Sequence, residues 1–222
     1  MRSSCYRKKP IQRLIAAEGY RWIALSLFAT VVAWFFGEWP AAILPLVLTG
    51  FVISFFRNPN RKIQRDQNVI LSPADGKILS VEKCREERYL GKECLRVSIF
   101  MSPFNCHINR APVAGRVVAT HYKTGTFEAA FKPKAMETNE HHAVHLADTS
   151  GRQWMVVQIA GSIARRIVSY VQPNDSLDMG ERFGLIQFGS RTDLYCPPDT
   201  KILVSAGEKV RGGKTIIGRT SL

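Results

Sequence analysis

The sequence predicts a mainly β domain that follows an N-terminal hydrophobic helical hairpin, and two observations support this fold class. First, residues 22–56 form two apolar runs with a single formal charge between them. Second, from about residue 66 onward short apolar stretches alternate with Gly, Pro, Asn and Asp, the pattern of closely spaced strands and turns. With 222 residues and 45% hydrophobic content, the chain can bury one full domain and a smaller element. We therefore expect a basic, membrane-associating segment at residues 1–65 and a β domain at residues 66–222.

The hairpin is expected from the apolar runs at residues 22–37 and 39–56. Each run is slightly shorter than the about 20 residues that a full membrane crossing needs. Basic residues precede the first run and follow the second, and such clusters favour the cytoplasmic side of a membrane. We therefore expect a turn at residues 37–40 and a hairpin that dips into the inner leaflet or crosses the bilayer twice. The protein would then lie at the cytoplasmic face of the cell (inner) membrane.

Two other interpretations of the apolar runs stay open. A cleaved signal peptide would have one apolar region and a small-residue cleavage site, whereas this chain has a second run with a basic exit. Two helices buried in the core of a soluble protein would be apolar over a similar length. The second alternative is the harder one to exclude.

The charge balance narrows the class of partner. Lys and Arg number 31 against 18 Asp and Glu, which gives a formal net charge of +13 and attracts polyanions such as nucleic acid or an anionic bilayer. A nucleic-acid-binding β domain would account for the charge but not for the apolar hairpin, and aromatic residues are not interleaved with the basic ones. We therefore expect an anionic membrane surface, and no nucleic acid, as a partner.

The cysteine pattern argues against a zinc site and against a disulfide framework. The chain has five of them, an odd number, and no two form a CxxC pair. This pattern is typical neither of a zinc site nor of a disulfide framework. We expect free thiols in a reducing compartment.

Three glycine-containing stretches refine the predicted β fold: PADGKI (73–78), PVAGRV (112–117) and AGEKVRGGKTIIG (206–218). They resemble the tightly turned strands of biotinyl/lipoyl-type sandwiches, so we expect a lipoyl/barrel-sandwich-like domain. The same resemblance gives an alternative function, a non-catalytic membrane-anchored carrier or binding module. The sequence has no EKM- or DKA-type attachment lysine for such a carrier.

Candidate acid–base residues lie in two places. His107 follows a probable strand and is surrounded by polar residues, a setting that favours acid–base chemistry. Asp75 belongs to an Asp-Gly pair, which is either a hairpin turn or a functional carboxylate. His141, His142 and His145 have no Cys or carboxylate set beside them, so we interpret them as solvated loop histidines and expect no metal site.

Five motifs give the strongest indication of function. In chain order they are FFRNPNR (55–61), SPADGKI (72–78), FMSPFNCHINRAPVAGRV (100–117), QIAGSIARRIV (158–168) and ERFGLIQFGSRTDLYCP (181–197). Together they resemble phosphatidylserine decarboxylases of the short bacterial and archaeal form. The resemblance implies a proenzyme that cuts itself at a Gly-Ser bond, here Gly189–Ser190. The products would be a β chain of residues 1–189 and an α chain of residues 190–222, which stay together as a heterodimer.

The resemblance also implies the cofactor and the reaction. Ser190 would become a covalent pyruvoyl group (pyruvate), with no metal and no diffusible cofactor. Phosphatidylserine would form a Schiff base with this group, lose CO2 and leave as phosphatidylethanolamine. A serine hydroxyl needs a base to act as a nucleophile, and we assign that role to His107, with Asp75 fixing its tautomer as in a hydrolytic triad. Gly189 suits the acyl side because it has no Cβ to block the attack.

One position departs from the pattern of the longer relatives. They carry a second histidine three residues after the first, where this chain has Arg110. Either His107 performs both proton transfers, or a histidine of residues 141–145 performs one. We expect Arg110 and Asn109 to bind substrate, since a guanidinium group can pair with a lipid phosphate.

Overall fold

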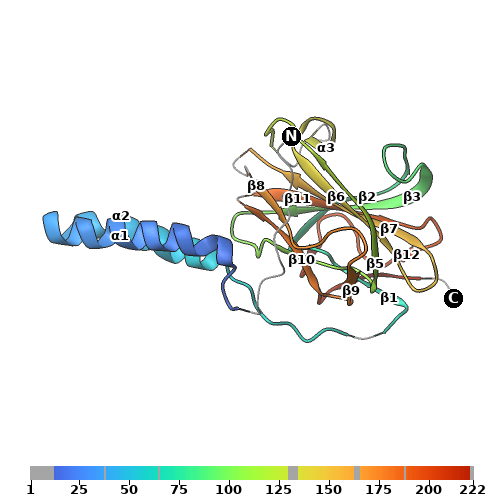
Figure 1. Ribbon diagram of the computed structural model, residues 1–222, viewed down its shortest axis with the longest axis horizontal. Helices are drawn as coiled ribbons and strands as arrows, with labels where there is room; N and C mark the ends of the chain where they lie inside the picture. Colours follow the sequence, from blue (N-terminus) through green and yellow to red (C-terminus); the bar gives the residue numbers. More distant parts are fainter. Residues whose placement is uncertain are drawn as a thin grey trace. The chain divides into compact units, whose positions relative to one another are not determined.

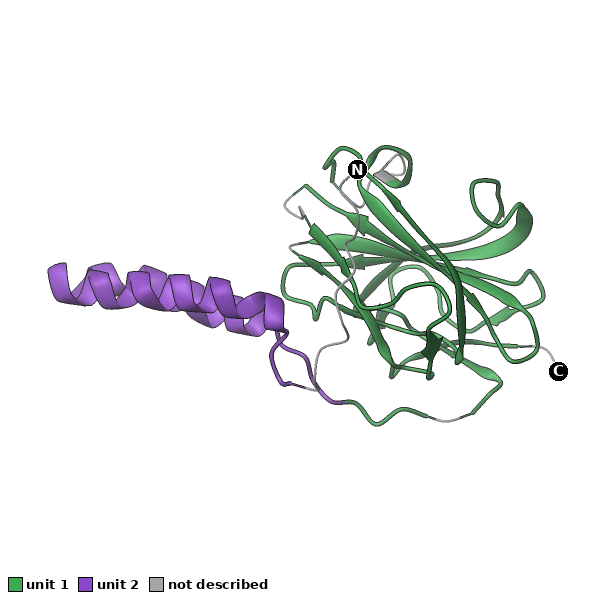
Figure 2. Cartoon of the chain, viewed as in Figure 1, with its two compact units in different colours: residues 1–9, 61–222 green, residues 10–60 purple. Residues whose placement is uncertain are grey.

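The structure is a computed structural model that describes residues 13–37, 39–64, 66–129, 135–162, 166–187 and 189–220. The expected basic residues before position 13, together with Cys5 and Glu38, lie outside the described residues. The chain divides into two compact units, residues 10–60 and the remainder (Figure 2).

The smaller unit is the hydrophobic helical hairpin that the sequence predicts (Figure 1). After the short 3-10 helix η1 (Ala17–Gly19) come α1 (Tyr20–Phe36) and α2 (Trp39–Phe55). Most of their apolar side chains are exposed, as expected of helices that lie in lipid. Among the described helices, the 20-residue segment Ala17–Phe36 is long and apolar enough to cross a membrane, and Trp39–Phe55 is shorter.

The two ends of the hairpin are tied together at its base. The Ala16 N–H donates to Phe56 O at 2.8 Å, and the Asn58 N–H donates to Leu14 O at 2.6 Å. Gly19 lies so close to Phe56 that a Cβ at this glycine would come within 2.6 Å of the Phe56 side chain. The motif that begins at Phe55 therefore has a structural role in closing the hairpin.

The larger unit contains an antiparallel eight-stranded sheet with the order β13-β2-β3-β11-β7-β6-β5-β9, which curls on itself (Figure 1). Its strands are β2 (Gly76–Glu86), β3 (Lys92–Met101), β5 (Gly115–Lys123), β6 (His141–Ala147), β7 (Gln153–Ala160), β9 (Ser176–Leu177), β11 (Ser190–Cys196) and β13 (Lys209–Val210). The short helix α3 (Ala135–Thr138) precedes β6.

Two small sheets complete the unit. One has the order β4-β10-β8, and the other has the order β1-β14-β12. Their strands are β4 (Ile108–Arg110), β10 (Arg182–Gln187), β8 (Arg166–Ser169), β1 (Val69–Leu71), β14 (Ile216–Arg219) and β12 (Lys201–Ile202).

The main core lies between these sheets. It joins Ile99 and Leu194 of the large sheet to Phe183 and Ile186 of β10, and to Ile217 of β14. Layered sheets around one core confirm the mainly β, sandwich-like fold that the sequence predicts. The expected free thiols are also present, because the four described cysteines, Cys84, Cys94, Cys106 and Cys196, form no disulfide.

One sequence-based expectation is wrong. His141, His142 and His145 do not lie in a solvated loop, since all three belong to strand β6. His141 and His142 are buried. The polar run ETNEHHA (137–143) hid the start of this strand, because imidazoles occupy its first two buried positions, His141 and His142.

Candidate active site

Ser190 is the first residue of β11, which lies between β3 and β7 in the large sheet. Its cross-strand partners are Met101 and Ala160, and we call these three residues the Ser190 row. The Ser190 side chain is fully buried, with Oγ 3.4 Å from Met101 Sδ. The hydroxyl therefore lies at the end of a central strand and not on an exposed turn.

Gly189 has a backbone φ of +66°, in the left-handed region. L-residues with a side chain are strained there, whereas glycine is not. A Cβ at this position would have room, since its nearest neighbour would be Pro103 Cγ at 4.0 Å. The backbone conformation, and not the space available, therefore calls for glycine before Ser190.

Thr192 lies on the same face of β11 as Ser190 and extends its surroundings. Its Oγ1 is 3.4 Å from Met101 Sδ and accepts a hydrogen bond of 3.1 Å from Asn109 Nδ2. Asn109 Nδ2 is also 3.8 Å from Met101 Sδ. The thioether of Met101 thus lies among two hydroxyls and an amide, all of them buried.

Two further residues continue this polar network across the sheet. Gln158 Nε2 donates to Asn109 Oδ1 at 2.7 Å, and Gln158 Oε1 lies 3.2 Å from His142 Nδ1. Since an amide oxygen only accepts, His142 Nδ1 carries a proton. We call Thr192, Asn109, Gln158 and His142 the amide network. Its hydrogen bonds all run in one direction, from His142 toward Met101.

The amide network carries no charge at neutral pH. Burial lowers the pKa of His142 to about 4, and it also lowers the pKa of its neighbour His141. The other members are amides and hydroxyls. The Ser190 row is therefore bordered on this side by neutral polar groups.

His107 lies just before β4 and is fully buried. Its backbone oxygen accepts from the Ile186 N–H at 3.3 Å, three residues before Gly189. The ring Nδ1 is 3.0 Å from the backbone oxygen of Asn105. A carbonyl oxygen only accepts, so Nδ1 carries the proton and Nε2 is the basic atom of the neutral ring.

Asp75 lies at the same end of the large sheet, immediately before β2. The register pairs Lys77 with Phe100, and Phe100 with Arg191. Because neighbouring strands are about 4.8 Å apart, the backbone next to Asp75 is about 10 Å from Ser190.

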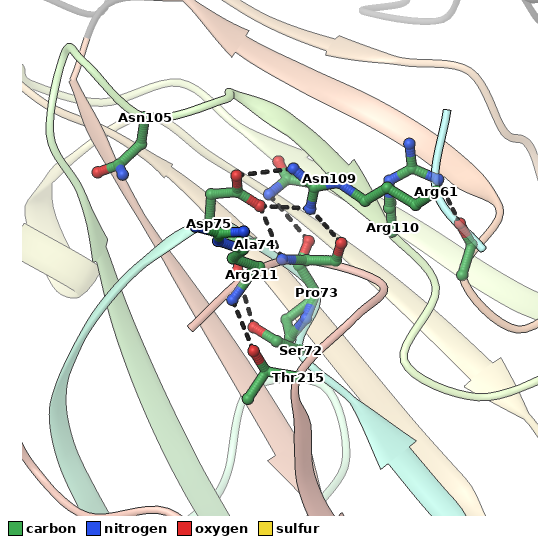
Figure 3. Close-up of polar contacts among 12 residues, drawn as sticks. Arg61, Ser72, Pro73, Ala74, Asp75, Asn105, Asn109, Arg110, Arg211 and Thr215 are labelled. Carbon is green, nitrogen blue, oxygen red and sulfur yellow. Dashed lines mark hydrogen bonds and ion pairs between the residues drawn. The ribbon is translucent and has the colours of Figure 1, made fainter. Parts of the chain in front are cut away.

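The Asp75 carboxylate binds a guanidinium group (Figure 3). Arg61 Nη1 and Nη2 lie 2.6 and 2.8 Å from its two oxygens, and the Gly212 N–H donates to Oδ1 at 2.7 Å. Arg61 Nη1 also donates to Gly212 O. A carbonyl thus holds His107 Nδ1 where we expected a carboxylate. The role of Asp75 in orienting His107 stays a prediction.

Comparison with known proteins places this site in a family. The family model described as phosphatidylserine decarboxylase matches residues 48–218. A phosphatidylserine decarboxylase proenzyme of Syntrophotalea carbinolica is 48% identical over 204 residues, which cover 92% of this chain and 95% of the relative. Proteins of the same name from Geotalea uraniireducens and Desulfotalea psychrophila are 46% and 43% identical, again over 92% of this chain and over 95% and 96% of the relatives. The chain belongs to the phosphatidylserine decarboxylase family.

In this member of the family, the two residues expected to bind substrate face different surroundings. Asn109 belongs to the amide network beside the Ser190 row. Arg110, the next residue of β4, donates from Nη1 to Gly180 O at 2.9 Å and is buried. Its pKa is lowered to about 10 by burial and by the neighbouring cations Arg182 and Arg61, so it keeps its charge at neutral pH.

Sequence reasoning missed several residues of the candidate site. Arg61 stands in one of the recognised motifs but was given no role, and Arg182 lies directly opposite Arg110 in the β4–β10 pair. Gln158 and Thr192 also stand in recognised motifs. No local sequence signal distinguishes Gln158 and Thr192, because they meet their partners only through the register of the strands. Among the described residues, no group of three or more His, Cys, Asp or Glu is arranged to hold a metal ion.

Proposed function

We propose that this chain is a phosphatidylserine decarboxylase that is made as a proenzyme and generates its own pyruvoyl group at Ser190. The observation that carries the proposal is the Gly189–Ser190 junction, where a left-handed glycine precedes a buried serine that is bordered by the neutral amide network. The relatives at 42–48% identity are named proenzymes, which supports self-processing.

Cleavage begins at the Ser190 hydroxyl. Oγ attacks the carbonyl carbon of Gly189, and the peptide nitrogen takes up a proton as the amide becomes an ester. The attack needs a base, and we assign this role to Nε2 of His107, whose Nδ1–H is fixed by the Asn105 carbonyl. Elimination then removes the Cα proton of residue 190 and breaks its Cβ–O bond, which leaves a carboxylate on Gly189 and dehydroalanine at position 190. Addition of water and loss of ammonia give the pyruvoyl group.

The residues around position 190 fit such a group. When present, it supplies a ketone that withdraws electrons from the amine of the bound lipid, as pyridoxal phosphate does in other decarboxylases. Loss of CO2 discharges a carboxylate, so a site without cations close to that carboxylate favours the step. Met101, Thr192 and Asn109 offer neutral contacts of this kind. We propose that Asn109 orients the head group through its place in the amide network.

Arg110, Arg61 and Arg182 are assigned to the phosphate of the lipid head group. Arg110 stays charged, and Arg61 and Arg182 lie near enough to lower its pKa. We propose that this positive region attracts the anionic head group of phosphatidylserine, with Arg110 binding its phosphate. Asp75 fixes Arg61 and, through Gly212, the loop before β14. Whether it also orients His107 during cleavage is tested below.

The hairpin supports a place at the cell (inner) membrane, on its cytoplasmic face. A diacyl lipid does not leave the bilayer readily, so the enzyme must work at the interface. The exposed apolar helices supply an anchor, and each basic residue near an anionic leaflet adds about 1 kcal/mol of attraction. This proposal gives the N-terminal unit and the net charge a common role.

The first test is the state of the chain. Unaltered protein should run as two fragments, residues 1–189 and 190–222, and the small one should lack a free amino terminus. Ser190→Ala should remain a single chain of 25.0 kDa. Ser169→Ala, which removes another buried serine, is the matched control and should still be cut. Fully active protein with an intact chain would rule out the proposal.

A second measurement follows the substrate. Borohydride added during turnover should attach labelled phosphatidylserine to the small fragment. Label found only on the large fragment would contradict a reactive ketone at position 190.

The base is tested by His107→Ala. If His107 is the sole base, this variant should fold but stay uncut. Survival of cleavage would move the role to the histidines of β6, of which His142 is linked to Asn109 through Gln158. Asp75→Asn is compared with Arg61→Gln. If Asp75 acts in cleavage, Asp75→Asn stays uncut while Arg61→Gln is still cut. If Asp75 serves only to hold Arg61, the two variants are cut alike.

A further inference from the structure

Two loops flank the Ser190 row, and each carries an exposed phenylalanine. On the β3 side, Phe104 follows Pro103, the nearest neighbour of Gly189, and its side chain is 76% exposed. On the β7 side, Phe127 is 36% exposed. We call residues 102–105 and 126–128 the Ser190 rim.

The exposure of Phe104 is built into a hydrogen-bonded turn. The Asn105 N–H donates to Ser102 O at 2.9 Å, while the Ser102 N–H and Oγ donate to Asn105 Oδ1 at 2.8 and 2.9 Å. The carbonyl of Asn105 in turn holds His107 Nδ1. The turn therefore presents Phe104 at its tip while its base orients the candidate catalytic base.

The second loop is held to the Ser190 row by Asn139. Its Nδ2 donates to Ala160 O and to Glu128 O, both at 2.8 Å, and its Oδ1 accepts from the Glu128 N–H at 3.0 Å. Ala160 is the cross-strand partner of Ser190. Phe127 is thus fixed on the opposite side of the row from Phe104.

Exposed basic side chains stand beside these apolar ones. Arg166 lies opposite Gln187, two residues before Gly189, and Lys123 ends β5 opposite His141. Both are exposed, and two exposed acids, Glu128 and Glu137, lie near the second loop. Aromatic side chains with flanking cations are the composition that binds an anionic lipid surface.

We propose that the Ser190 rim inserts into an anionic bilayer, with Phe104 entering the boundary between head groups and acyl chains. A lipid could then reach Ser190 directly from the leaflet. The identity of the lipid as substrate rests on the proposed function, whereas the contact between rim and bilayer does not. The hairpin keeps the chain on the membrane, and the rim determines which end of the β unit meets it.

The kinetic test compares two forms of substrate on the full-length, processed enzyme. One is long-chain phosphatidylserine in vesicles of phosphatidylcholine and phosphatidylglycerol, and the other is a short-chain phosphatidylserine dissolved as a monomer. Phe104→Asp should lower kcat/KM on vesicles about tenfold to a hundredfold, the equivalent of losing the burial of one aromatic side chain. It should leave kcat/KM for the monomeric substrate unchanged, and Phe104→Leu should behave like the unaltered enzyme.

The matched control is Val118→Asp. Val118 is 49% exposed on β5, five residues from Lys123, so it lies about 16 Å from this end of the sheet. It should lose activity on neither substrate. Equal losses of Phe104→Asp on both substrates, or no loss on either, would overturn the proposal. So would conversion of a dimer to a monomer by Phe104→Asp, because a second copy would then cover the rim.

A measurement independent of activity separates this proposal from the proposed function. Phe104→Trp should add fluorescence that doxyl-labelled lipids quench, beyond the quenching of the native tryptophans, and replacing phosphatidylglycerol by phosphatidylcholine should weaken it. Val118→Trp should add fluorescence that is not quenched. If neither the unaltered protein nor Phe104→Trp releases CO2 but the fluorescence added by Phe104→Trp is quenched, the proposed function fails and the lipid contact stands. If the fluorescence added by Phe104→Trp is not quenched, the rim does not contact the bilayer, whether or not the enzyme is active.

Discussion

The two faces of strand β11 have different chemical environments within a few residues of each other. One face carries Ser190 and Thr192, which contact a thioether and neutral amides. The other carries Arg191 and Asp193, whose side chains form a buried ion pair with Nε–Oδ1 and Nη2–Oδ2 distances of 2.6 and 2.9 Å. Arg191 Nη2 also donates to Ser98 Oγ at 2.9 Å. The alternation of side chains along a strand separates these environments completely.

The difference shows where this protein places its charges. A buried ion pair is tolerated when each group is fully hydrogen-bonded, and it then fixes geometry more than it adds stability. The Arg191–Asp193 pair fixes β11 to β3 through Ser98. Among the residues that the structure describes, the hydrogen-bond partners of the face with Ser190 and Thr192 carry no formal charge, so the carboxylate of a bound amino acid would find few groups there that stabilise its charged form. The strand thus combines a rigid charged face with a neutral one.

The largest effect is expected from breaking the charged face. Asp193→Ala leaves the Arg191 guanidinium buried without its carboxylate, which should lower the free energy of unfolding by about 3–5 kcal/mol. The measurement is urea unfolding in the Ser190→Ala background, where the chain stays in one piece. The double variant Arg191→Met with Asp193→Leu should recover most of the loss. If Asp193→Ala lowers the free energy of unfolding by less than an ordinary surface substitution does, the Arg191–Asp193 pair does not hold β11 in place.

A smaller effect is expected from acidifying the neutral face. His142 is buried and its pKa is lowered to about 4, against 6.5 in an exposed site. Between these values the unfolded chain binds a proton that the folded chain does not, so stability is full above pH 6.5 and falls as the pH drops toward 4. The expected loss is roughly 3 kcal/mol.

The control for this pH dependence is a substitution at the same site. His142→Gln should reduce the slope of the stability curve between pH 6.5 and 4, leaving the part due to His141 and His145, whose pKa values are also lowered by burial. An unchanged slope in His142→Gln would show that another group carries the acid sensitivity.

The smallest effect is expected from one hydroxyl of the amide network. Thr192→Val keeps the shape of the side chain but removes the nearest acceptor of Asn109 Nδ2, which keeps only the longer contacts with Pro73 O at 3.4 Å and Met101 Sδ at 3.8 Å, at a cost of about 1–3 kcal/mol. Self-cleavage should also slow, because Asn109 and Met101 border Ser190. Thr192→Ser restores the hydroxyl and should restore both the stability and the cleavage rate. Wild-type behaviour of Thr192→Val would limit the network to a packing role.

Local patterns in the sequence were sufficient for most of the elements, whereas the Gly189–Ser190 junction was singled out only by the resemblance to a known family. The apolar runs predicted the hairpin because its side chains face no core, and short apolar stretches such as WMVVQIAG predicted strands because alternation is a local property. The start of the strand His141–Ala147 escaped this reasoning, since His141 and His142 occupy its first two buried positions.

The partners within the site could not be read in the same way. Gln158 meets Asn109, and Asn109 meets Thr192, only because strands far apart in the chain align in one register. The group that orients His107 is the backbone carbonyl of Asn105, which no side-chain pattern reveals. For Asp75, the sequence suggested His107 as the partner, and only the packing of residues 61 and 212 brings a guanidinium group to its carboxylate.

The central place of β11 in the large sheet has a consequence for heat inactivation. This strand pairs with β3 along seven residues and with β7 along six. A molecule severed before residue 190 would lose its thirty-odd C-terminal residues on melting, and that short piece has no core of its own with which to refold. Cooling would then demand an encounter between two separate polypeptides, so the processed enzyme should inactivate irreversibly at temperatures from which the unsevered Ser190→Ala protein recovers.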